Sequence, residues 1–155
     1  MSSQIEAIYA ALADKTVTVD GKTPPVYGLD NPIGTLTSAK LPVRILHPFG
    51  NGSEGRNFAF DGMACIAQMT WTIVDFMAFQ AVGQGKPPTG AMIRYQAAYM
   101  DMLLTFKRAG GDTNPAIKAK LADARCQAGV YEWPLGSEEW WYGVQAVLNI
   151  EEVLV

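Results

Sequence analysis

Charged residues are scarce in this chain: Asp, Glu, Lys and Arg make up 17% of its 155 residues, against about 25% in ordinary soluble domains. The net charge is −3, and Lys107 and Arg108 are the only adjacent basic residues. Electrostatic binding to nucleic acid needs clustered basic side chains, so we expect no direct, sequence-specific nucleic-acid binding. With so little charge, the chain must bury much of its surface in its own core or against partner proteins.

Long apolar runs are also missing. No stretch of about 18 uncharged apolar residues occurs, so we expect no membrane-spanning helix. The longest candidate, MTWTIVDFMAF at residues 69–79, is interrupted by Asp75. The N-terminus has neither the basic nor the long apolar segment of a signal peptide. These absences predict a protein of the cytoplasm, or of a particle assembled there.

Histidine and cysteine are nearly absent, since the chain has His47, Cys65 and Cys126 alone. No serine or cysteine lies in a nucleophile-elbow pattern, the cysteines form no CxxC pair, and the carboxylates are dispersed. The glycine-rich stretches at 50–55 and 83–90 lack the P-loop and dinucleotide signatures. We therefore expect a protein that is not an enzyme, with no catalytic residue, metal site or cofactor. His47 is expected to have a structural or surface role, and the two cysteines are expected to be buried, reduced thiols.

Apolar residues at helical spacing predict two helices. The first is expected over residues 2–14, capped by Ser2 or Ser3, with Glu6 completing a capping box. The second is expected over residues 88–108 and ends before Gly110 and Gly111. One apolar line along this helix consists of Ile93, Ala97, Met100 and Leu104. A second apolar set widens the line: Met92, Tyr99, Leu103 and Phe106. The opposite side is polar and carries Arg94, Asp101, Thr105 and Arg108.

Period-2 alternation predicts strands over residues 41–49, 69–79, 120–131 and 141–154, with a short extended piece at 26–27 and a turn at 134–137. Exposed loops are expected at about 21–40, 50–57 and 82–90, and a loop or short helical turn at 112–119. Together these elements predict a single α+β domain over residues 1–155, in which two helices pack on one face of an antiparallel or mixed sheet. Four polar residues predict a less apolar second face: Thr70, Thr72, Gln145 and Asn149.

A carboxylate within an apolar strand leaves three alternatives open. Asp75 is expected to be solvated near a strand end, paired with Arg44, Arg94 or Arg125, or pressed against another subunit, because a buried unpaired carboxylate is costly. The adjacent residues Trp140 and Trp141 point to opposite faces of one strand, so one of them can enter the core while the other is exposed or covered.

Five further residues complete the predicted subunit interface, to which Asp75 could add a polar contact. The glycine-rich tip at 50–57 could reach a neighbouring subunit through Glu54 and Arg56. Exposed aromatic residues at Phe58, Phe60 and Trp141 could anchor the contact.

Four segments carry a resemblance to a known family: IEAIYAAL at 5–12, LPVRILHPFGNGSEGRNFAF at 41–60, TWTIVDF at 70–76 and AGVYEWPLGSEEWWYGVQAVLNIEEVL at 128–154. In their content and order, over nearly the whole chain, they resemble the small tail-terminator or tail-completion proteins of long-tailed bacteriophages. That family has no catalytic motif to transfer to particular residues.

The resemblance implies a structural virion protein at the head-proximal end of the tail, assembled in the host cytoplasm. Proteins of this kind form a homo-oligomeric ring, a hexamer, that caps the tail tube and joins it to the head connector. The implied partners are further copies of the chain, the tail tube protein and the head–tail connector protein. Two alternatives stay open: a neck or head-completion protein of the same particle, or a small monomeric binding domain.

Overall fold

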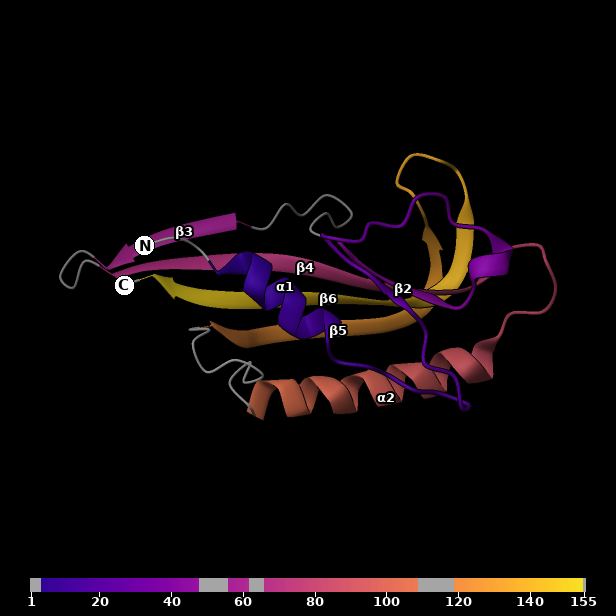
Figure 1. The fold of residues 1–155 in the computed structure, drawn as a ribbon, viewed down its shortest axis with the longest axis horizontal. Helices are drawn as coiled ribbons and strands as arrows, with labels where there is room; N and C mark the ends of the chain where they lie inside the picture. Colours follow the sequence, from indigo (N-terminus) through magenta and orange to yellow (C-terminus); the bar gives the residue numbers. More distant parts are fainter. Residues whose placement is uncertain (1–3, 48–55, 62–65, 109–118, 155) are drawn as a thin grey trace.

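The computed structural model describes residues 4–47, 56–61, 66–108 and 119–154 (Figure 1). Its elements in chain order are α1 (Ile5–Ala13), β1 (Val26–Tyr27), the short 3-10 helix η1 (Ser38–Lys40), β2 (Val43–His47), β3 (Arg56–Asp61), β4 (Ile66–Ala81), α2 (Thr89–Arg108), β5 (Ala119–Glu132) and β6 (Trp140–Leu154). The predicted strands, the second helix and the turn at 134–137 are therefore confirmed, with shifts at their ends. The expected loop or turn at 112–119 lies almost entirely outside the described residues.

All six strands belong to one sheet with the order β1-β2-β4-β6-β5, and β3 pairs with β4 as well. Strand β1 runs parallel to β2, and every other pairing is antiparallel. Both β2 and β3 lie on the same side of β4, since β6 occupies its other side: β2 pairs with residues 74–78 and β3 with residues 66–71. The sheet is mixed and carries two helices, so the α+β prediction is confirmed.

The long antiparallel pair β4–β6 forms the centre of the sheet, and its alternation assigns each residue to a face. Ile73 lies opposite Leu148 and Met77 opposite Val144, and all four side chains are buried. These residues form a core with the buried sides of α1 and α2, which include Leu12, Tyr95 and Tyr99. One face of the sheet is therefore covered by helices, as predicted.

The prediction of a less apolar second face holds at one end only. There Thr72 donates a hydrogen bond to Asn149 across the strands at 3.1 Å, and both residues are half-buried. At the other end a second core lies on this face, formed by Leu36, Val43, Ile45, Phe76, Ala78 and Trp141. The chain at 27–41 supplies its cover, which period-2 counting on the strands could not reveal.

The first helix begins later than predicted, at Ile5, with Gln4 at its N-cap and no side-chain cap. The cap from Ser2 or Ser3 was therefore wrong. The backbone N–H of Gln4 instead donates to the carboxylate of Glu152 on β6. Glu152 is 1% exposed and also accepts a hydrogen bond from the indole of Trp71 at 3.0 Å. A distant acidic residue thus satisfies a free N–H at the helix start, where the helix dipole favours negative charge.

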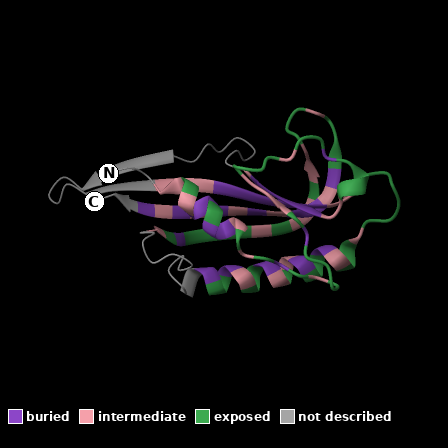
Figure 2. Ribbon diagram, in the orientation of Figure 1, coloured by how far each residue is buried: buried purple, intermediate pink, exposed green. Residues whose placement is uncertain are grey.

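The buried face of α2 also differs from the predicted one. The core-facing residues are Met92, Tyr95, Tyr99, Leu103 and Phe106. The apolar line expected to lead this face is exposed instead: Ile93 is 57%, Met100 50% and Leu104 53% accessible, and Ala97 is exposed as well. In Figure 2 buried and exposed residues alternate along α2 as its two sides turn into view. The helix has apolar residues on more than one side, and the broader set containing two tyrosines packs on the sheet.

Candidate functional site

Asp75, in the middle of β4, is buried in the core and paired with an arginine. Its carboxylate accepts hydrogen bonds from Arg44 Nε at 2.9 Å, Arg44 Nη2 at 2.7 Å and the hydroxyl of Tyr99 at 2.6 Å. The guanidinium of Arg44 also donates to the backbone carbonyls of Leu12 and Lys15 at the end of α1. Of the three alternatives for Asp75, the arginine partner is the one found, and the partner is Arg44.

Within this cluster of Arg44, Asp75 and Tyr99, the buried positive and negative charges compensate each other. Burial alone would lower the pKa of Arg44, but the charge and hydrogen bonds of Asp75 outweigh burial and raise that pKa above its usual value. Burial, reinforced by the neighbouring Asp75 charge, raises the pKa of Tyr99 far above its usual value. Arg44 therefore stays charged and Tyr99 stays neutral across the physiological range. The cluster joins β2, β4 and both helices.

The predicted interface aromatic Trp141 is also an interior residue. It is 5% exposed, lies in the second core, and its indole donates to the carbonyl of Trp133 at 3.0 Å. Its neighbour Trp140 is the exposed member of the pair, at 49%. Neither Asp75 nor Trp141 presents side-chain surface to a second subunit in this fold. The expectation that one tryptophan enters the core is confirmed, but the exposed one was assigned to the wrong position.

Three of the remaining predicted interface residues lie on one strand of the sheet. Arg56, Phe58 and Phe60 belong to β3, opposite Trp71, Met69 and Ala67 of β4. Glu54 and most of the predicted tip at 50–57 lie outside the described residues. The structure therefore brings three of the six predicted residues together on one strand.

That strand is an open sheet edge, as are β5 and the two-residue strand β1. Strand β3 has β4 on one side, and β5 has β6 on one side; among the described residues no strand pairs with the outer side of either. Over the 14 residues of β5 the side chains are mostly exposed or half-buried. An unpaired strand edge offers backbone donors and acceptors to another chain.

The exposed apolar line on α2 lies beside the β5 edge. Figure 1 shows α2 running along β5 at the border of the molecule. The amide of Gln96 donates to the carbonyl of Cys126 on β5 at 3.0 Å, which fixes the rotation of the helix. We call Ile93, Ala97, Met100 and Leu104 the α2 seam. Between the seam and β5 lies a groove of about 250 Å³ lined by Met100, Leu103, Leu104 and residues 121–124 and 126.

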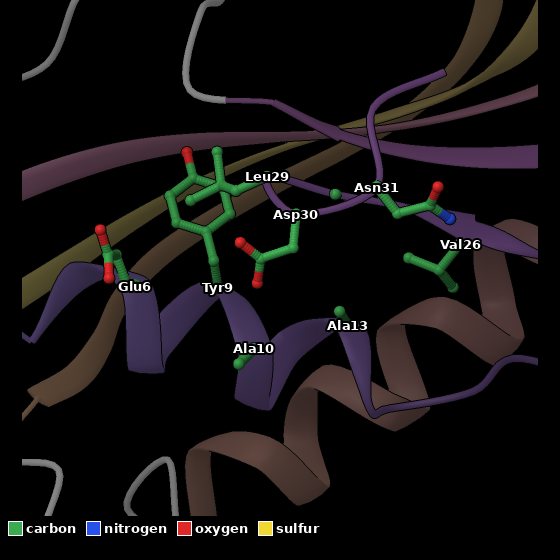
Figure 3. Close-up of a pocket in the computed structure, with 9 residues that line it drawn as sticks. Glu6, Tyr9, Ala10, Ala13, Val26, Leu29, Asp30 and Asn31 are labelled. Atoms are coloured by element: carbon green, nitrogen blue, oxygen red, sulfur yellow. The ribbon is translucent and has the colours of Figure 1, made fainter. Parts of the chain in front are cut away.

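Two other hollows lie on the surface. The first is a pocket of about 180 Å³ between α1 and the chain at 26–31, and Figure 3 shows Leu29 and Asp30 above Tyr9 and Ala10 of the helix. Glu6 and Asp30 are its two carboxylates. No group of three or more His, Cys, Asp or Glu residues suited to a metal occurs among the described residues. The second hollow, about 400 Å³, lies between β4 and the start of α2.

The structure also describes the surroundings of His47 and Cys126. His47 lies half-buried at the end of β2 with its ring 4.7 Å from the ring of Trp133. Cys126 is a half-buried free thiol, and burial raises its pKa to about 11. Cys65 lies outside the described residues. Within the described chain, no helix is long and apolar enough to cross a membrane.

No protein-family model matches the chain, and no curated protein matches it significantly. The exposed surface is therefore the guide to function. Among its features are the open edges of β3 and β5 and the α2 seam, which can contact other protein chains. Sequence reasoning missed the seam because its residues look like core; the signal was that α2 has more apolar positions than one buried face can hold.

Proposed function

We propose that this protein is a structural component of a long-tailed bacteriophage particle and not an enzyme. In this proposal, copies of the chain form a ring, a hexamer, at the head-proximal end of the tail. The ring caps the tail tube and joins it to the head connector. The specific place in the particle rests on the resemblance of the segments at 5–12, 41–60, 70–76 and 128–154 to tail-terminator proteins.

One structural observation supports assembly into a ring: the open edges at β3 and β5 differ, with six residues in the first strand and 14 in the second. An interface in which a patch meets its own copy closes at two subunits, whereas a ring requires two different patches that meet head to tail. Strand β5 of one copy and β3 of the next are such a pair. Pairing over the six residues of β3 would extend the contact for roughly 20 Å along the strands.

The proposal gives Arg56, Phe58 and Phe60 a role that their position on β3 allows. Each copy would use β3 toward one neighbour and β5 toward the other. Closing the ring then covers the outer sides of β3 and β5 and leaves the two-residue strand β1 as the open edge among the described strands, which limits uncontrolled edge pairing.

The experiment that tests the place in the particle is electron microscopy of virions labelled with gold on this chain. Gold at the junction of tail and head is the expected result. Gold at the distal tail tip, or particles without any label, would overturn the proposal. Mass photometry of the isolated ring provides the copy number, since six chains of 16.8 kDa give a particle of about 101 kDa.

A further inference from the structure

The α2 seam is left without a partner by the strand-edge contacts of the proposed ring. Its four residues are spaced by four, three and four positions along the helix. That is the alternating spacing at which one helix packs its apolar residues against another helix. Three of the four side chains are large, and each has at least half its surface exposed. A second helix is therefore the partner whose shape fits the seam.

The seam is symmetric about its own midpoint, between Ala97 and Met100. If a second α2 packs against it in the opposite direction, Ile93 faces Leu104 of the second copy and Ala97 faces Met100. The two large residues at the ends then meet each other, and the small residue meets the flexible methionine. A patch that fits its own copy in this way produces a two-fold contact.

Charges beside the seam favour the same arrangement. Arg94 and Asp101, both exposed, lie seven positions apart on the same flank of α2. In the antiparallel pair Arg94 of each copy lies close to Asp101 of the other, which gives two attractive contacts. In a parallel pair the same two residues would lie beside Thr89 and Gln96 of the second copy, which carry no charge. Charge complementarity therefore selects a second copy of this chain in antiparallel orientation.

From this geometry we propose that two copies of the protein dimerise through the α2 seam, with their α2 helices antiparallel about a two-fold axis near Ala97 and Met100. One helix per copy makes a small interface, so the dimer is weak, with a Kd in the micromolar range or above. The contact does not use the strand edges β3 and β5. It is therefore compatible with the proposed ring, in which it would join one ring to another, and it does not depend on that function.

Sedimentation velocity from about 10 µM to about 1 mM tests the dimer. The wild-type chain is expected to shift from monomer to dimer, or from one ring to two, with rising concentration. Leu104→Glu should weaken this association at least about tenfold. The matched control is Thr105→Glu, an exposed neighbour off the seam, which should change it less than about twofold. Equal effects of the two variants, or no association at any concentration, would overturn the proposal and leave the seam to another protein.

Charge exchange tests the orientation. The measurement uses an Asp20→Asn background, because Asp20 pairs with Arg94 within one chain at 2.9 Å. Asp101→Arg is expected to weaken the dimer, and adding Arg94→Asp should restore it. Failure of the second change to restore association would argue against antiparallel packing.

Distance measurement between spin labels provides an independent check. The label is attached at the first residue of α2 through the substitution Thr89→Cys, after both native cysteines are replaced by serine. In the antiparallel dimer the two labels lie near opposite ends of the helix pair. They are about 30 Å apart, because about 19 helical positions at 1.5 Å each separate them along the helix axis. A parallel pair would bring them to about 10 Å, and that result would refute the orientation. Ring failure leaves these outcomes unchanged, since the proposed ring uses β3 and β5.

Discussion

Removing the charge of Asp75 is the most direct test of the buried cluster. Asp75→Asn keeps the shape of the side chain but leaves Arg44, which is 1% exposed, without its negative partner. Breaking a buried ion pair on one side costs about 3–5 kcal/mol. Domains of this size have about 5–15 kcal/mol of stability, so the variant should lose a large part of it while remaining folded in the absence of denaturant.

Urea unfolding followed by circular dichroism measures this loss. With a slope of about 2 kcal/mol per M, a loss of about 4 kcal/mol lowers the unfolding midpoint by about 2 M. The exposed pair of Arg94 and Asp20 provides the matched control, because its side chains are 58% and 49% accessible. Asp20→Asn should cost less than about 1 kcal/mol. A loss below about 1 kcal/mol for Asp75→Asn as well would refute the view that Arg44 depends on Asp75.

Three further predictions concern α2 and the strand beneath it. Tyr99→Phe removes a hydrogen bond to a charged group and should cost about 1.5–3 kcal/mol of folding stability. Tyr95→Phe should instead stabilise the protein by about 1 kcal/mol, because the Tyr95 hydroxyl is buried with no hydrogen-bond partner among the described residues. Urea unfolding of both variants checks these opposite signs. Leu103→Ala should cost about 2–5 kcal/mol and Leu104→Ala less than about 1, because the first side chain is 6% and the second 53% exposed; equal melting shifts would contradict this helix orientation. Burial raises the pKa of Cys126 from 9.0 to about 11, so at pH 8 the folded protein, with its other cysteine replaced by serine, should react with a thiol reagent about 100-fold more slowly than the unfolded protein. The preference for the protonated thiol stabilises the folded state fully below pH 9 and is lost as the pH rises through 11.

The strands could be predicted from sequence because their faces differ. Buried Val144, Ala146 and Leu148 alternate with half-buried Gln145, Val147 and Asn149 along β6, and this contrast sets the period. In β2 and the centre of β4 the polar and apolar residues alternate in sequence, but residues 43–46 and 73–78 are buried on both faces. Period counting assigns residues to faces but does not say what covers each face. The second core, under the irregular chain at 27–41, therefore appeared only in the structure.

The helix faces were harder to predict for a related reason. Helix α2 has apolar residues around most of its circumference, so spacing alone offers two stripes that differ by about a third of a turn. Tyr95 and Tyr99 decide between them, because the Tyr99 hydroxyl reaches the buried carboxylate of Asp75. That contact joins residues 24 positions apart, and no local pattern records it. The partner of Asp75 was predictable only as a choice among three arginines.

The cluster around Arg44 also has a consequence for how the molecule opens. Its guanidinium bonds to the end of α1 and to β4, and through Asp75 it is joined to Tyr99 on α2. If either helix detached, the buried Arg44–Asp75 pair would lose some of its hydrogen bonds, and this partly open state would have a high free energy. Local opening of one helix is therefore suppressed, and amide protons of α1 should exchange with solvent at rates close to those of the central strands. A nine-residue helix near the chain end thus gains the kinetic protection of the core.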